Sequence, residues 1–137
     1  MAAMIELNDE QAMLLETAAE FCRHHLTFDA VRTGLEREES IPRSVWQQMV
    51  DLGWLGILIP AEYGGLGLGP GHVVPIMESM GRQLMHTPLF ATVSATEAIL
   101  TSASDAQKHQ WLPRIAAGAV ASLAVTEADG NWNLEQL

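Results

Sequence analysis

Apolar residues recur at helical spacing in five stretches of this chain. The stretches begin on residues that favour helix starts, such as the capping pair Asn8 and Gln11 and the capping box Ser104-Asp-Ala-Gln107. The pattern predicts an all-α fold, an orthogonal or up-down bundle of about five helices. The expected helices run from Asn8 to near Thr27, from Pro42 to Gly53, from His72 to about Leu84, from Thr87-Pro88 through Leu100, and from Ser104 to Gly118.

Three of the expected helices carry features that predict how they pack. Gly81 lies within the apolar face of the third helix, which suggests close contact with another helix. The fourth helix contains one charged residue, Glu97, so we expect it to be buried on most sides. In the fifth helix, Pro113 removes a backbone donor and is expected to kink or split the helix.

A glycine-rich segment joins the second and third helices. Seven of the eleven glycines lie between Gly53 and Gly71, and glycine permits both positive φ and close backbone approach. A phosphate cradle is disfavoured, because the dinucleotide fingerprint needs a further glycine where the chain has Pro70, His72 or Val74. The Walker pattern also fails, since no lysine precedes the helix. We interpret the segment as a turn between packed helices.

The residues after Gly118 differ from the helical part. Residues 119–126 have an extended pattern, and Asp129-Gly130-Asn131 is a turn signal before a further strand. A strand without a partner is an unsatisfied edge. We therefore expect a helical domain at residues 1–118 and the incomplete beginning of a β domain at residues 119–137.

Composition narrows the class of function. The formal net charge is −10 and Lys108 is the sole lysine, so the chain has neither a nucleic-acid-binding surface nor a polybasic membrane-binding segment. No apolar run reaches the ~20 residues that span a bilayer, and no signal peptide is evident. Cys22 is the one cysteine, which fits a reducing compartment. We expect a soluble, cytoplasmic protein in which Cys22 is a buried structural thiol.

No complete catalytic or metal-binding set occurs in the sequence. The five histidines lack the i, i+4 spacing of a zinc-binding helix, and the G-x-S-x-G motif is absent, so no metal site is expected. Glu78 and Glu97 are candidates for buried general bases. The alternative is a solvated or salt-bridged carboxylate at each position, which the spacing of Glu78 and Arg82 favours.

Two segments resemble the acyl-CoA dehydrogenase family of flavoproteins, and together they cover nearly the whole chain. The first comprises Leu52-Gly-Trp-Leu-Gly, Pro60-Ala-Glu-Tyr-Gly-Gly-Leu-Gly and Glu78-Ser-Met-Gly-Arg82. The second comprises Ser104-Asp-Ala-Gln-Lys108, Trp111-Leu-Pro-Arg-Ile-Ala-Ala-Gly118 and Leu123-Ala-Val-Thr-Glu127. The resemblance implies the family's N-terminal helical domain followed by the opening strand of its middle β domain.

The resemblance also implies an activity, the FAD-dependent α,β-dehydrogenation of an acyl-CoA thioester. In the family a glutamate removes the α proton, the β hydrogen passes as hydride to flavin N5, and an electron-transfer flavoprotein accepts the electrons. The glutamate belongs to a C-terminal helical domain, so no catalytic residue is expected in this chain. The fragment alone is expected to be inactive and to hold no FAD tightly, and the complete protein to form homo- or hetero-oligomers.

The resemblance assigns cofactor-binding residues where the motif matches. The family's flavin-side strand corresponds to Leu123, Val125 and Thr126, of which Thr126 would offer its hydroxyl and backbone groups to the isoalloxazine ring. The family then continues Thr-Glu-Pro and Gly-Ser-Asp, whereas this chain continues Glu127-Ala-Asp-Gly-Asn131. The departure indicates a divergent subgroup or an altered acyl pocket.

The resemblance also assigns substrate-binding residues. In the family the acyl tail runs between the third and fourth helices. Phe90, Val93 and Ser94 match that region and are expected to line it, with core packing as the alternative role of each.

Two other functions stay open. One is a related flavin enzyme of the superfamily, such as an acyl-CoA oxidase, which differs in oxygen access and in its base. The other is a stand-alone helical partner that completes the flavin site of a separate chain. A reading frame that continues past Leu137 into β strands favours the single-chain enzyme, whereas a stop codon there favours the partner.

Overall fold

A computed structural model describes residues 6–25, 32, 41–126 and 130 of the chain. Its α-helices are α1 (Asp9–His25), α3 (Arg43–Asp51), α4 (Val74–Arg82), α5 (Leu89–Ser102) and α6 (Asp105–Ala116). Three 3₁₀ turns lie in the glycine-rich segment, η1 (Trp54–Gly56), η2 (Ala61–Tyr63) and η3 (Pro70–His72). The described residues contain no strand, and the all-α prediction is confirmed.

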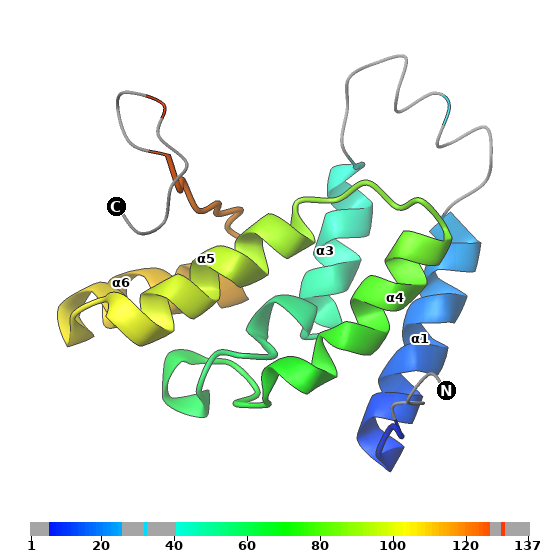
Figure 1. Cartoon of the computed structure of the whole chain (residues 1–137), viewed down its shortest axis with the longest axis horizontal. Coiled ribbons are helices and arrows are strands. Elements are labelled where there is room, and N and C mark those ends of the chain that lie inside the picture. Colours follow the sequence, from blue (N-terminus) through cyan, green and yellow to red (C-terminus); the bar gives the residue numbers. More distant parts are fainter. Residues whose placement is uncertain (1–5, 26–31, 33–40, 127–129, 131–137) are drawn as a thin grey trace.

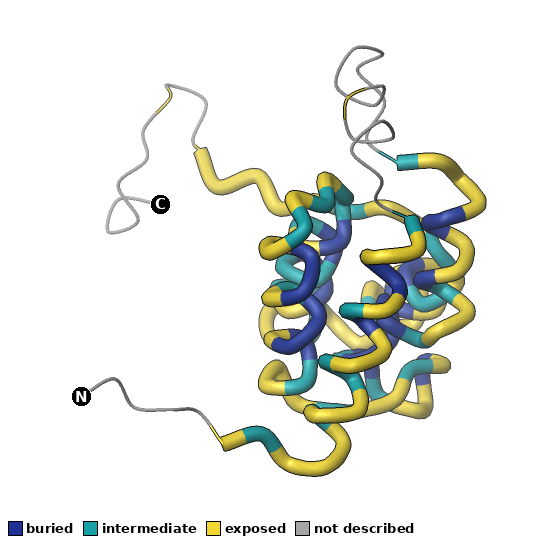
Figure 2. The backbone as a smooth tube through the Cα atoms, turned by 90° about the vertical axis from the view of Figure 1, so that its right-hand side faces the viewer, coloured by how far each residue is buried: buried dark blue, intermediate teal, exposed yellow. Residues whose placement is uncertain are grey.

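The helices form two pairs with the glycine-rich segment between them. α1 packs on α4, and α5 packs on α6. Figure 1 shows the two pairs on opposite sides of the molecule, with α3 between them. In Figure 2 the buried positions of the helices face one another and the exposed positions face outward.

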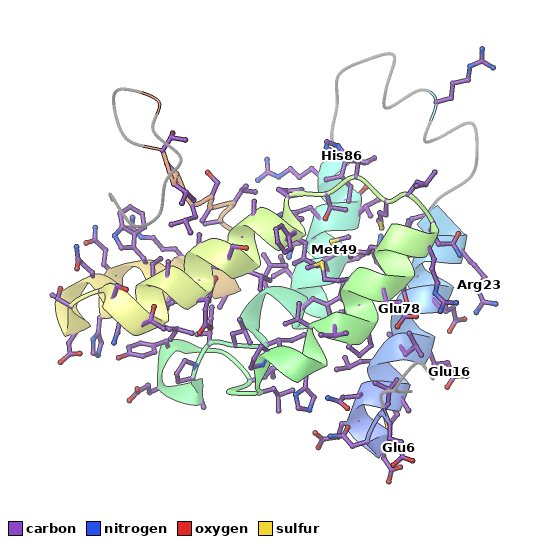
Figure 3. The ribbon with its side chains drawn as sticks, in the orientation of Figure 1. Glu6, Glu16, Arg23, Met49, Glu78 and His86 are labelled. Carbon is purple, nitrogen blue, oxygen red and sulfur yellow. The ribbon has the colours of Figure 1, made fainter. Side chains whose placement is uncertain are left out.

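Two apolar clusters fill the interior. The larger one joins α1, α3, α4 and the start of α5 around Met49, which Figure 3 shows in the centre of the packed side chains. The smaller one lies between η2 and α6 and contains Ile59, Tyr63, Leu112 and Ile115. The glycine-rich segment contributes to both clusters, so it links the two helix pairs through the core.

Two helix starts have the predicted capping geometry. At α1, the Gln11 amide donates to Asn8 Oδ1 at 2.8 Å, and the Asn8 amide donates to Gln11 Oε1 at 3.0 Å. At α6, Ser104 and Gln107 make the same reciprocal pair. Each box satisfies donors that the first turn of a helix leaves free.

Two helices, α4 and α6, end in the same hydrogen-bonded motif, the Schellman motif. One residue of this motif has positive φ, and it is a different residue type in the two helices. After α6, Gly118 has φ +106°, and the amides of Gly118 and Ala119 donate to the carbonyls of Ile115 and Arg114 at 2.9 Å each. This Schellman arrangement confirms Gly118 as the helix stop. After α4, Leu84 takes the corresponding position at φ +55° with its side chain 77% exposed. A leucine with positive φ carries backbone strain that glycine avoids.

One packing expectation was wrong, and two others were wrong in part. Gly81 is exposed, and a Cβ there would meet no atom within 4 Å, so no helix approaches it. α5 has an exposed side as well as a buried one, since Phe90 is 70% exposed while Leu89 is 1% exposed. Pro113 does not split α6, which is continuous from Asp105 to Ala116.

The glycine-rich segment folds back on itself through its backbone. The amides of Leu66, Gly67 and Leu68 donate to the carbonyls of Gly56, Ile59 and Ile57 at 2.8, 2.8 and 2.7 Å. Gly65 lies at the closest approach, where an added Cβ would be 2.0 Å from the Ile59 carbonyl oxygen. The backbone segments can approach closely enough to form these hydrogen bonds only with glycine at position 65.

We expect Gly65→Ala to lower the free energy of unfolding by at least about 2 kcal/mol, because the methyl group displaces the backbone of residues 56–59. Urea denaturation measures the loss. Gly69→Ala is the matched control, since position 69 has open space and negative φ. Equal stability of the two variants would contradict the close approach.

We expect Leu84→Gly to raise the free energy of unfolding by roughly 0.5–1 kcal/mol, because it relieves the positive φ at little cost in packing. Gln83→Gly serves as the control, since Gln83 has φ −101° and gains nothing from glycine. A destabilised Leu84→Gly variant would show that the leucine side chain outweighs the backbone strain.

Candidate functional site

The predicted flavin-side residues lie on a segment that leaves the helical body after Gly118. Two side chains from distant parts of the chain hold its first residues. The indole Nε1 of Trp46 donates to the Gly118 carbonyl at 2.8 Å. The Thr92 hydroxyl donates to the Ala121 carbonyl and accepts from the Ala121 amide, at 3.3 Å in both directions.

Beyond Ala121 the segment is free of these contacts. Leu123 is 51% exposed, Val125 is 37% exposed, and Thr126 is also exposed. Within the described part of the chain, no backbone hydrogen bond joins residues 122–126 to another element. Figure 2 shows the exposed segment leading away from the body. Leu123, Val125 and Thr126 therefore present apolar side chains, a hydroxyl and backbone groups outward.

This segment has neither helix nor strand structure between residues 119 and 126. The predicted turn at 129–131 and the strand from Trp132 fall outside the described residues, Gly130 excepted. The division into a helical domain at 1–118 and a β domain at 119–137 thus stays a prediction.

The three predicted acyl-contacting residues lie on α5 but differ in what they contact. Phe90 is 70% exposed. Val93 is half-buried against the larger core cluster. Ser94 donates its hydroxyl to the Phe90 carbonyl of its own helix at 2.9 Å. Phe90 therefore has most of its side chain open to a ligand, whereas the contacts of Val93 and Ser94 are largely internal.

A hollow of about 230 Å³ lies elsewhere, between α1 and α4. Its lining residues are Leu15, Ala19, Ser79, Arg82 and Gln83. No predicted site residue borders it. The hollow is a surface feature of the α1–α4 pair and is separate from the segment after Gly118.

Neither carboxylate candidate is a buried base. Glu78 is exposed and forms an ion pair with Arg82, four residues later on α4. Glu97 is exposed on α5. Within the described residues, no group of three or more His, Cys, Asp or Glu side chains is placed to hold a metal ion. Over the same residues, no helix is long and apolar enough to cross a membrane.

Polar contacts that the sequence did not reveal attach the glycine-rich segment to α1. Gln11 Nε2 donates to the Gly71 carbonyl at 3.2 Å. His72 Nδ1 lies 3.2 Å from the Gly69 carbonyl, and Nε2 lies 3.3 Å from a Glu10 oxygen without hydrogen-bond geometry. These contacts fix η3 against the first turn of α1, which is a structural role.

Cys22 is a buried free thiol, and the predicted burial is confirmed. Its side chain is fully buried on α1, and Sγ lies 3.7 Å from Met85 Sδ. Burial raises the pKa of the Cys22 thiol from 9.0 to about 11. The reactive thiolate is therefore scarce at neutral pH.

The chain matches the family described as "Acyl-CoA dehydrogenase, N-terminal domain" over residues 8–119. This match includes every helix among the described residues and the first anchored residue, Gly118. The chain belongs to the acyl-CoA dehydrogenase family.

Individual relatives agree with the family match. The chain is 36% identical to (2S)-methylsuccinyl-CoA dehydrogenase of Cereibacter sphaeroides over 74% of its own length and 19% of that protein. It is 33% identical to mitochondrial isovaleryl-CoA dehydrogenase of Bos taurus over 88% of its length and 29% of that protein. A variant of the Tcur3481-Tcur3483 steroid ACAD has a TM-score of 0.77 at 29% identity, covering 88% of this chain and 33% of that one. The chain thus spans less than a third of the curated relatives it matches here.

We expect the stability of the protein to fall between about pH 9 and pH 11 through Cys22. In this window the unfolded chain has lost the thiol proton while the folded chain retains it, so unfolding is favoured as the pH rises, by roughly 2 kcal/mol in total. Urea denaturation across this range measures the effect.

Cys22→Ala is the comparison for this measurement. The variant should start less stable but lose the Cys22 part of the decline, and a decline identical to wild type would contradict it. The thiol should also resist alkylation at about pH 8 until denaturant is added.

Proposed function

We propose that this chain is the N-terminal portion of an FAD-dependent acyl-CoA dehydrogenase that introduces an α,β double bond into an acyl-CoA thioester. The observation that carries the proposal is the outward-facing segment from Leu123 to Thr126, which follows the anchored residue Ala121 and a domain that matches this family. The chain covers only part of each relative, so the activity is assigned to the complete protein.

The exposed residues fit a flavin ring by their chemistry. Leu123 and Val125 offer apolar surface for the ring face, and Thr126 offers a hydroxyl group. The backbone groups of residues 122–126, which form no hydrogen bond with another element in the described part of the chain, would supply donors and acceptors for the polar edge of the ring. FAD, once bound, would accept the hydride from the substrate. This chain would bind and orient the ring, and no residue in it is assigned as the catalytic base.

Phe90 is the strongest of the three acyl contacts. Its ring is the largest apolar side chain exposed on α5, so it offers surface to an acyl tail or to a further domain. Val93 would border the tail from its half-buried place. The Ser94 hydroxyl would border the tail while keeping its hydrogen bond to the Phe90 carbonyl.

Further apolar surface supports burial of this domain in a larger protein. Trp111 is 44% exposed and Val120 is 60% exposed, in addition to Phe90. Large exposed apolar side chains of this kind are typical of surfaces that other protein covers. We propose that the rest of the enzyme or a second subunit covers them, and that an electron-transfer flavoprotein reoxidises the reduced enzyme.

The test compares the 137-residue chain with the complete protein that contains it. We expect the complete protein to purify with FAD in stoichiometric amount and its visible flavin absorbance to bleach when an acyl-CoA is added without oxygen. The chain alone should hold no FAD and show no dehydrogenase activity. A complete protein without flavin would overturn the proposed function.

A point variant then tests the assigned segment. In the complete protein, Thr126→Val should weaken FAD binding by about threefold to tenfold, which is the effect of losing one hydrogen bond. Ser122→Ala, on the same exposed segment, should leave it unchanged. Equal affinities of all three proteins would contradict the role assigned to Thr126.

A further inference from the structure

We infer that Thr92 is a positioning residue of the flavin site, whose hydroxyl fixes the register at which residues 122–126 leave the helical domain. The inference rests on the proposed function, because those residues are the ones assigned to the cofactor. Thr92 is on α5, is 1% exposed, and is 29 residues from Ala121 in sequence.

The Thr92 hydroxyl forms the two hydrogen bonds with Ala121 that a residue on a neighbouring strand would form. It accepts from the Ala121 amide and donates to the Ala121 carbonyl, so one oxygen atom satisfies both backbone groups of the residue. In a sheet, paired residues exchange a donor and an acceptor in the same way. A valine at position 92 would fill the same space but leave both backbone groups of Ala121 unpaired.

Register matters here because the anchored segment is short. Trp46 holds the Gly118 carbonyl, and Thr92 holds Ala121 three residues later. The Ala121 side chain also packs against the smaller core cluster. In a strand, successive side chains point to opposite faces. Once these residues pair as the opening strand of the β domain expected in the complete protein, a slip of one residue would exchange Leu123 and Val125 for smaller neighbouring side chains at the cofactor.

Thr96 provides a matched control on the same helix. It is also 1% exposed, and its hydroxyl donates to the Thr92 carbonyl at 2.8 Å. It makes no hydrogen bond with the described residues 119–126. Replacing Thr96 by valine thus removes a buried hydroxyl from α5 without touching Ala121.

The first experiment measures amide hydrogen exchange by NMR in the 137-residue chain. Thr92→Val should accelerate exchange of the Ala121 amide at least tenfold relative to the Leu112 amide, which reports on α6 and on global unfolding. Thr92→Ser keeps the hydroxyl and should preserve the wild-type ratio, as should Thr96→Val. An unchanged ratio in Thr92→Val overturns the inference.

The second experiment measures the visible absorbance spectrum and dissociation of FAD in the complete protein. Thr92→Val should shift the flavin spectrum and weaken FAD binding severalfold, Thr92→Ser should restore both, and Thr96→Val should change neither. Normal flavin properties in Thr92→Val, despite faster Ala121 exchange, overturn the positioning role alone. A wild-type protein that binds no FAD overturns the proposed function, and the inference with it.

Discussion

The close packing of Gly65 against the backbone of residues 56–59 is the constraint on which the rest of the structure depends. No side chain fits at position 65, and the amides on either side of it complete the hydrogen bonds that fold the glycine-rich segment. The fold places Ile57 in the larger apolar cluster and Ile59 in the smaller one. A single tight turn thereby supplies apolar residues to both clusters and links the two helix pairs through the core.

Sequence patterns predicted the helices well where local chemistry decides the structure. The capping boxes at Asn8 and Ser104 and the stop at Gly118 depend on residues within one turn of each other, and all three are present as expected. The faces of α5 were not predictable in this way. Nearly every position of α5 is small or apolar, so the sequence has no polar stripe to mark the exposed side, on which Phe90 lies.

In the candidate site, too, residues within a sequence motif were predictable, whereas contacts between residues far apart in the sequence were not. The family motif located Leu123, Val125 and Thr126 on the segment after Gly118, and their roles await the measurements proposed above. The two side chains that anchor the segment had no local signal. Trp46 and Thr92 are 72 and 29 residues away from their partners, so no pattern within one helix turn indicates either hydrogen bond.

The Trp46–Gly118 hydrogen bond has a consequence for synthesis on the ribosome. It joins α3 to the residue after α6, so it cannot form until the chain has been made past Gly118. N-terminal domains generally fold as units during synthesis, and contacts of large sequence separation form late and slowly. The anchor thus forms only after α6 has been synthesised. The segment that follows is then presented, already oriented, to whatever part of the polypeptide emerges next.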